Sequence, residues 1–185
     1  MTHLEPGSAP LGEGGLVELP TGGYLVSFER HYARSVVDVW DAISSPEGLD
    51  AWYPTKLRHE GVVGTAITET FEWPDGTPPE PAAPGVLTAY DPPHLFAVTV
   101  HGPDESEYPG ELGTQVIRMR VDAGASPAEC MLRFEHEVET TPTAVAVLPG
   151  WHWCLEALAI HLGAPGNVSK EFHDQVRDWY HLKHS

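Results

Sequence analysis

Apolar and polar positions alternate along the middle of the chain and predict a run of β-strands. The alternating or β-branched segments are 64–73, 85–90, 94–102, 114–123 and 128–139, and an earlier one starts at Tyr24. Short breaks rich in Gly, Pro, Asp and Ser separate them, which is typical of consecutive antiparallel strands. In the last two segments one face is expected to be apolar and the other charged. The apolar face carries Ile117, Met119, Val121, Leu132, Phe134 and Val138, with His136 among them.

Two short helices are predicted between the first strand and the rest of the sheet. Ser35 is the expected N-cap of the first helix, and Asp38 stands three residues later, where a capping box needs it. The stretch "SSPEG" ends this helix, and Pro46 then occupies the first position of a second one. Trp40 is predicted to be a core residue, whereas Trp52 is expected at the mouth of a cavity.

The C-terminal third of the chain predicts two further helices. Residues 141–162 form the longer one, whose apolar stripe is Trp151, Leu155, Leu158 and Leu162. Pro149 is expected to kink or interrupt it. A second helix follows the "APG" break at 164–166, and its stripe of Phe172, Val176 and Trp179 predicts that it docks on the domain.

These elements predict one α+β domain with additions at both ends. Residues 1–22 are rich in Gly and Pro and are expected to form a flexible arm, 23–163 the domain, and 164–185 a helical extension. The order of elements predicts a helix-grip fold, in which a curved antiparallel sheet wraps around a long C-terminal helix. A gap between helix and sheet that is lined by aromatic side chains would be a ligand pocket.

Three stretches within residues 24–163 carry a resemblance to a known family. They are "VWDAISSPEGLDAWY", "GVLTAYDPPHLFAVTV" and "GWHWCLEALAIHL". The chain resembles the SRPBCC superfamily of START and Bet v 1-like domains, in the branch similar to the activator of heat shock protein 90 ATPase. The resemblance implies a helix-grip fold, and in this superfamily the fold hosts ligand carriers, cyclases, hydrolases and cochaperone-like modules. His136 stands at the family's frequent strand-end histidine, and Thr99 stands where an aromatic residue is often found.

Charge and cysteine content narrow the classes of function. The formal charge is −17, from 27 acidic and 10 basic residues, which argues against binding to nucleic acid or to anionic lipid. Cys130 and Cys154 are the two cysteines and have no spacing typical of a metal site or a disulfide framework. The N-terminus lacks the pattern of a signal peptide, and no apolar run reaches the length of a membrane span. A cytoplasmic protein without metal or cofactor is expected.

Several polar residues are candidates for chemistry. His136 lies on the predicted apolar face, where it is either a hydrogen-bonded structural residue or a general base, and His101 ends a strand at the rim or in an exposed turn. His152 and Glu156 have the i, i+4 spacing of a metal or acid–base pair, but the helical wheel places them on the solvent side. Arg118, Arg120 and Arg133 share a sheet face with Glu135 and Glu137, which predicts cross-strand ion pairs.

Three functions remain open from the sequence. The first is the binding of a hydrophobic or aromatic small molecule between the sheet and the C-terminal helix, with His136 or Tyr90 orienting a polar group. The second is a cyclase or aromatase that uses the same cavity, with His136 or His101 moving protons, and the third is a chaperone-linked protein that binds a heat-shock ATPase. A homodimer is also an open alternative. The expected ligand contacts are Trp52, Phe71, Trp73, Tyr90, Thr99, Met119, Phe134, His136, Trp151, Leu155 and Leu158.

Overall fold

A computed structural model describes residues 9–10, 12–72, 77–81, 84–101 and 113–185. The strands are β1 (Gly15–Glu18), β2 (Tyr24–Tyr32), β3 (Lys56–Arg58), β4 (Ala66–Phe71), β5 (Glu80–Pro81), β6 (Gly85–Asp91), β7 (Leu95–His101), β8 (Thr114–Ala123) and β9 (Cys130–Val138). The helices are α1 (Val36–Ser44), α2 (Pro46–Leu49), α3 (Thr141–His161) and α4 (Lys170–Lys183). The strands pair antiparallel in the order β1-β2-β9-β8-β7-β6-β4-β3, and β5 pairs with β4.

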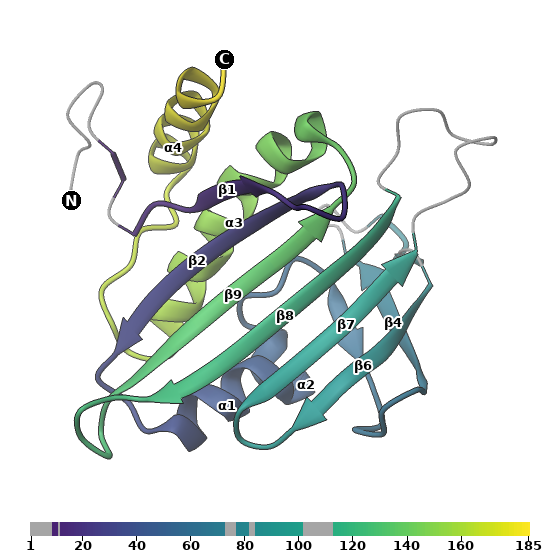
Figure 1. Cartoon of the computed structure of the whole chain (residues 1–185). Helices are drawn as coiled ribbons and strands as arrows, with labels where there is room; N and C mark the ends of the chain where they lie inside the picture. The colour runs from purple at the N-terminus through teal and green to yellow at the C-terminus, as the bar shows by residue number, and fades with distance from the viewer. Residues whose placement is uncertain (1–8, 11, 73–76, 82–83, 102–112) are drawn as a thin grey trace.

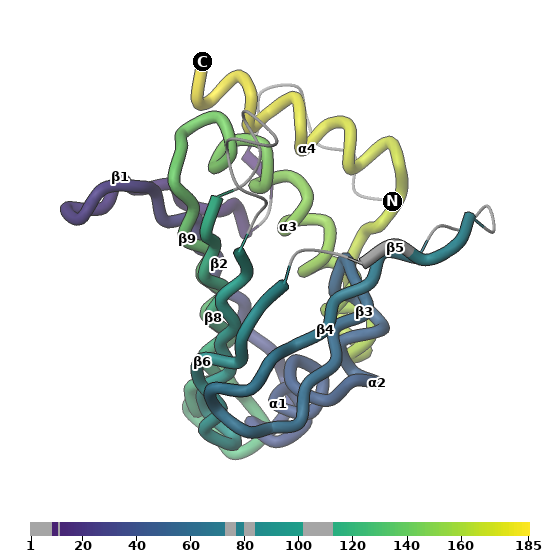
Figure 2. Tube along the Cα trace, turned by 90° about the vertical axis from the view of Figure 1, so that its right-hand side faces the viewer, coloured from purple at the N-terminus to yellow at the C-terminus, as the bar shows by residue number. Residues whose placement is uncertain are grey.

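The sheet curls around α3, as the helix-grip prediction requires. Figure 1 shows β2 and β6–β9 side by side in front of α3, with α1 and α2 behind the lower end of the sheet. In the side view, β3 and β4 curve away from the layer of β2, β8 and β9, and α4 lies on the far side of α3 (Figure 2). The predicted α+β helix-grip fold is therefore confirmed.

Alternation along the strands separates an apolar inner face from a charged outer face. In β9 every second residue is buried, and His136 is among them as predicted. On the outer face Arg118 pairs with Glu137 and lies 3.9 Å from Glu135. Arg133 lies 3.1 Å from Glu29 of β2. The predicted cross-strand ion pairs of Arg118 and Arg133 are confirmed, and since these side chains are more than a third exposed, each pair contributes at most about 1 kcal/mol.

Helices α1 and α2 begin as their sequence predicts. Ser35 caps α1 in a capping box with Asp38, and Ser45 caps α2, whose first residue is Pro46. Trp40 is buried in the core against Tyr90, at 5.4 Å between ring centroids. These observations confirm the predicted starts of both helices and the core position of Trp40.

Helix α3 continues through Pro149, so of the predicted kink or interruption the interruption does not occur. Pro149 lies in the ninth position of the helix and is buried with its neighbour Leu148. By length and composition α3 could cross a membrane, but half of its apolar stretch is buried inside the fold. The buried stripe of Trp151, Leu155 and Leu158 packs in the core, where the sequence placed it.

The other side of α3 is covered by α4 and by the N-terminal segment, and this corrects the prediction for His152. His152 was expected to face solvent, but it is 0% exposed, with Phe28 of β2 and Phe172 of α4 at 6.0 and 5.9 Å between ring centroids. The helical wheel failed here because α4 buries the side of α3 that the sheet does not reach.

The two chain ends meet at this covered side of α3. The predicted flexible arm contains β1, which pairs with β2 from Tyr24 to Ser27, so the arm prediction does not hold for residues 15–18. In α4 the buried residues are Phe172, Val176 and Tyr180. Tyr180 is therefore the third buried residue of the stripe, where the sequence predicted Trp179. The predicted docking of this helix is confirmed by its buried stripe.

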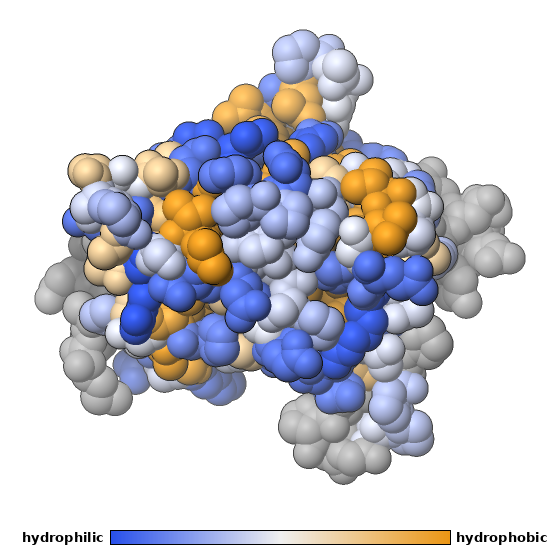
Figure 3. All heavy atoms as spheres, turned by 90° about the horizontal axis from the view of Figure 1, so that it is seen from below, coloured by the Kyte–Doolittle hydropathy of each residue, from blue (hydrophilic) through white to orange (hydrophobic). Residues whose placement is uncertain are grey.

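The lower end of the molecule exposes little apolar surface. Figure 3 views this end and shows hydrophobic residues in small, separate patches within a mostly hydrophilic face. The exposed large apolar side chains include Val37, Val62 and Val63. Patches of this size are ordinary on protein surfaces and indicate no binding site.

Candidate ligand site

Trp151 of α3 is the point where helix, sheet and α2 meet. Its ring centroid lies 4.5 Å from that of Phe134 and 5.7 Å from that of His136, both on β9. The same ring centroid lies 5.5 Å from that of Tyr53, which follows α2. The side chain is 7% exposed. The indole of Trp151 is thus buried among aromatic rings from β9 and from the turn after α2.

A chain of hydrogen bonds fixes His136 beside this ring. The indole N–H of Trp151 donates to Nδ1 of His136 at 2.8 Å, so the imidazole hydrogen is on Nε2. Nε2 in turn donates to Oε1 of Gln115 at 2.8 Å. Burial lowers the pKa of His136 to about 4, which keeps the ring neutral at pH 7. Both ring nitrogens of His136 are therefore engaged in hydrogen bonds, as the structural interpretation of the sequence expects.

A second polar contact joins Tyr53 to the β3–β4 side of the sheet. The hydroxyl of Tyr53 donates to Oε1 of Glu69 at 3.4 Å. Glu69 lies opposite Leu57 in the β3–β4 pairing, and Leu57 is fully buried, so the Glu69 carboxylate is on the inner face of the sheet. Burial raises the pKa of Glu69, while the nearby hydroxyls of Thr55 and Tyr53 lower it in part. A carboxylate with a raised pKa on an apolar wall is a functional candidate.

Thr55 adds a buried hydroxyl to the same wall. Its side chain is 6% exposed, and Oγ1 has no hydrogen bond of ordinary geometry among the described residues. The hydroxyl nevertheless lies near enough to Glu69 to lower the pKa of that carboxyl, so its interaction with Glu69 is present but poorly aligned. We call Trp151, His136, Gln115, Tyr53, Thr55 and Glu69 the Trp151 site.

Four residues of the Trp151 site were not predicted from the sequence, although the alternation of their strands points to two of them. In "AITETF", Ile67, Glu69 and Phe71 alternate on one face, and Glu69 is the charged residue in that series. In "TQVIRMRV", Gln115 opens the series that continues with Ile117. Tyr53 and Thr55 carry no such signal, because they lie in the turn between α2 and β3.

The predicted ligand contacts separate into groups in the structure. Met119, Phe134, Leu155 and Leu158 are fully buried core residues around α3, and Trp151 and His136 form the site itself. Phe71 is partly exposed at the end of β4, and Trp73 lies outside the described residues. Leu155 and Leu158 stabilise the helix–sheet contact, and among the predicted contacts Trp151 and His136 are joined by a hydrogen bond.

Three of the predicted contacts lie away from Trp151. Tyr90 packs with Trp40 and with His59, at 5.5 Å between the ring centroids of Tyr90 and His59, under the α1 end of the sheet. Thr99 alternates with the buried Val98 and is on the outer face, so it does not line the interior. The indole N–H of Trp52 donates to the carbonyl of Ala42 at 2.9 Å, inside the α1–α2 contact.

His101 is an exposed residue at the end of β7. Its Nδ1 lies 3.4 Å from the hydroxyl of Thr114 on the neighbouring strand. The turn-like surface position allowed by the sequence is the one observed. Within the described residues, no group of three or more His, Cys, Asp and Glu side chains is placed to hold a metal ion.

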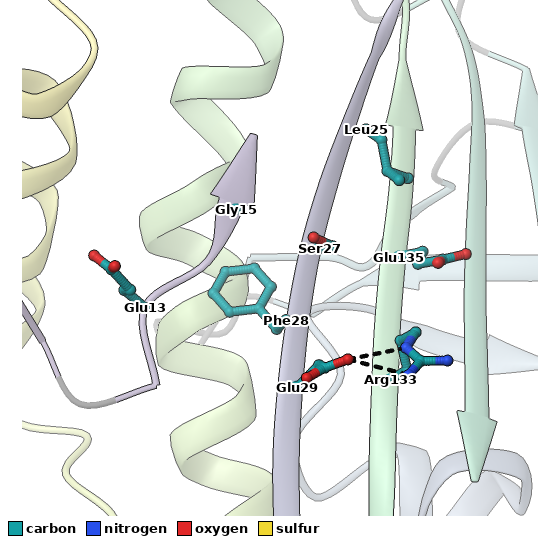
Figure 4. A pocket seen from close by; sticks show the side chains of 8 residues that line it. All are labelled: Glu13, Gly15, Leu25, Ser27, Phe28, Glu29, Arg133 and Glu135. Atoms are coloured by element: carbon teal, nitrogen blue, oxygen red, sulfur yellow. Dashed lines mark hydrogen bonds and ion pairs between the residues drawn. The ribbon is translucent and has the colours of Figure 1, made fainter. Parts of the chain in front are cut away.

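A separate hollow of about 440 Å³ lies at the edge of the sheet, where the chain enters β1 beside β2. Figure 4 shows Phe28 pointing toward α3, whereas the Glu29–Arg133 pair and Glu135 lie over the outer side of β2 and β9. Its lining is Glu13, Gly15, Leu25, Ser27, Phe28, Glu29, Arg133 and Glu135. This hollow is open and mostly polar, and it is not the helix–sheet interior that the sequence predicted as the pocket.

Comparisons with known proteins agree with this architecture. The family model described as "Activator of Hsp90 ATPase homolog 1-like protein" matches residues 33–163. CalU16 from Micromonospora echinospora has 19% sequence identity and a TM-score of 0.65, over 94% of this chain and 98% of that one. A Bordetella parapertussis protein encoded by gene BPP1335 has 19% identity and a TM-score of 0.66, over 98% and 95% of the two chains.

A conserved protein of unknown function from Enterococcus faecalis, EF2215, has 18% identity and a TM-score of 0.63, over 92% of this chain and 89% of that one. No curated protein shows significant similarity. At these identities the solved structures establish the fold alone. The family match spans most of the domain, from the start of α1 to the end of α3, and the chain therefore belongs to the family of activator of Hsp90 ATPase homolog 1-like proteins.

Proposed function

We propose that this protein binds a hydrophobic or aromatic small molecule at the Trp151 site, between the sheet and α3. The observation that carries the proposal is the position of Trp151, whose ring centroid lies 5.5 Å from that of Tyr53 and 4.5 Å from that of Phe134. Apolar walls with a few converging polar groups are the usual composition of small-molecule sites. Here the polar groups are the amide of Gln115, the hydroxyl of Thr55 and the carboxylate of Glu69.

We infer that a ligand would enter at the same end of the interior. Gln115 and Glu69 are partly exposed, whereas the residues deeper along their strands, Ile117 and Ile67, are buried. A ligand that entered between these two polar side chains would meet Trp151 first. Affinity would come mostly from burial of apolar area, at about 25 cal/mol per Å² removed from water.

The geometry weighs against His136 as the proton-transfer group of a cyclase. Its Nδ1 lone pair accepts the indole N–H of Trp151, and its lowered pKa leaves it uncharged at neutral pH. A general base needs a free lone pair and a pKa near the working pH. The family description supports a heat-shock ATPase as a partner. No contact among the described residues adds support for that partner.

Two variants of the same helix test the binding proposal. Trp151→Phe keeps a ring but loses area and the hydrogen bond to His136, whereas Trp153→Phe changes an exposed indole two residues away. Titration with the uncharged dye N-phenyl-1-naphthylamine would report binding by its fluorescence. We expect saturable binding that Trp151→Phe weakens about fivefold or more and Trp153→Phe leaves unchanged.

Thermal unfolding would show that both variants are folded before they are compared. If the wild-type protein gives no saturable signal, the proposed function is wrong. Equal affinities for the wild type and a folded Trp151→Phe would place binding elsewhere and also contradict the proposal.

A further inference from the structure

The polar groups on the β3–β4 side of the Trp151 site share one chemical property. Glu69 presents a carboxylate, and Thr55 and Tyr53 present hydroxyls. No Lys or Arg of the described chain contributes to the pKa of Glu69, which burial and the two hydroxyls alone perturb. The neighbouring Lys56 reaches Asp50, 3.5 Å away, on the other side of β3. The site therefore offers acceptors and neutral donors, with no cation to pair with an acidic ligand.

We propose that Glu69 makes the Trp151 site selective for aromatic ligands that carry an amine, and that it rejects the corresponding carboxylic acids. This inference rests on the proposed function, because it concerns the same site. An ammonium group beside Glu69 would form a charge-assisted hydrogen bond in a partly desolvated place. A carboxylate there would meet a like charge and no counter-ion.

The position of Glu69 supports a role in ligand choice rather than in folding. Its hydrogen bond with Tyr53 is long, at 3.4 Å, and Thr55 Oγ1 beside it lacks a partner of good geometry. Some carboxylates of the described structure are paired with cations, as Glu29 is with Arg133 at 3.1 Å, and others accept backbone N–H groups, as Glu139 accepts that of Thr114 at 2.9 Å. Glu69 has no such pair in the described structure, so a ligand amine would be its first cationic partner.

Three probes with one ring system separate charge from hydrophobicity. They are 2-naphthylmethylamine, 2-naphthoic acid and the uncharged 2-naphthalenemethanol, titrated calorimetrically at pH 7. About 0.15 M salt would screen the field of the −17 charge beyond ~8 Å, so that local contacts decide the result. We expect the amine to bind at least about tenfold more tightly than the acid, with the alcohol between them.

Glu69→Gln should bring the affinities of amine and acid within about threefold of each other, because the amide has the same shape without the charge. Glu60→Gln is the matched control, since it removes one charge from an exposed position and should leave the ratio unchanged. Equal binding of acid and amine to the wild type would overturn the selectivity proposal, as would an unchanged ratio in Glu69→Gln. If none of the three probes binds, the proposed function itself is wrong. If the alcohol binds but the protein does not discriminate between amine and acid, only the selectivity proposal is wrong.

Discussion

The hydroxyl of Tyr180 lies 3.1 Å from Nδ1 of His152, and it also accepts the backbone N–H of Gly14 at 2.6 Å. One phenol thus connects α4, α3 and the segment before β1, three parts of the chain that are far apart in sequence. Tyr180 and His152 are both fully buried. Gly14 and Tyr180 lie outside the matched family segment 33–163, whereas His152 lies within it.

Replacing Tyr180 by Phe should destabilise the protein by about 1–3 kcal/mol, because the N–H of Gly14 and Nδ1 of His152 would be buried without a partner. Urea unfolding measures the change. Leu182→Ala on the same helix is the control, since Leu182 is 78% exposed and its loss should change stability by less than about 0.5 kcal/mol. If Tyr180→Phe costs no more than this control, the phenol does not hold the chain ends.

Two buried histidines should make the protein sensitive to mild acid. Burial lowers the pKa of His136 to about 4 and that of His152 to about 3, from 6.5 in the unfolded chain. Between pH 6.5 and 4 the unfolded state therefore binds more protons than the folded state, and stability falls as pH falls. Each histidine contributes a slope of up to about 1.4 kcal/mol per pH unit in this range.

Urea unfolding at pH 7.5, 6.5, 5.5 and 4.5 would test this slope. His136→Gln should lower stability at pH 7.5 but also flatten the dependence by about 1 kcal/mol per pH unit below pH 6.5. His181→Gln, in the last turn of α4, replaces an exposed histidine and is the matched control. Parallel curves for the wild type and His136→Gln would contradict the buried, neutral state of His136.

Local patterns in the sequence were sufficient to predict much of the fold. The strand predicted at 114–123 has the bounds of β8, and the capping signals at Ser35 and Pro46 have their predicted contacts. These features depend on neighbours within a few residues or on strict alternation, so the sequence alone specifies them. The burial of His136 on the apolar face followed from the same alternation.

The errors came from contacts between distant segments. The environment of His152 is set by Tyr180 and Phe172, which a helical wheel of α3 alone does not include. Trp52 was placed at a mouth, yet its indole N–H is used at Ala42 in the previous helix. Glu69 was overlooked because one charged residue in a strand is usually a solvated one, and only the curl of β3 and β4 turns its face inward.

Trp52→Phe should cost about 1–3 kcal/mol, since it leaves the buried carbonyl of Ala42 without its donor and removes packing against Tyr53. If Trp52 does not contact ligand, the affinity for N-phenyl-1-naphthylamine should stay within about twofold of the wild type. Trp151→Phe, measured in parallel, should show the opposite pattern, with the larger effect on the affinity for the dye and the smaller effect on stability. A large loss of affinity in a folded Trp52→Phe would return Trp52 to the ligand site.

Gly48 and Gly150 are both helical glycines, and they should respond to alanine in opposite directions. A Cβ at Gly48 would lie 2.5 Å from the carbonyl oxygen of Asp41 and 2.6 Å from Cα of Ala42, both backbone atoms of α1. Since backbone cannot move aside without separating α1 from α2, Gly48→Ala should destabilise the protein by about 2 kcal/mol or more.

A Cβ at Gly150 meets no atom within 4 Å, and alanine is the better helix former by about 0.5–1 kcal/mol. Gly150→Ala should therefore raise the thermal midpoint, while Gly48→Ala lowers it, in the same calorimetric experiment. A stable Gly48→Ala would mean that α1 and α2 are not in tight contact. The placement of Tyr53 beside Trp151 would then lose its support, because Tyr53 follows the end of α2 by four residues.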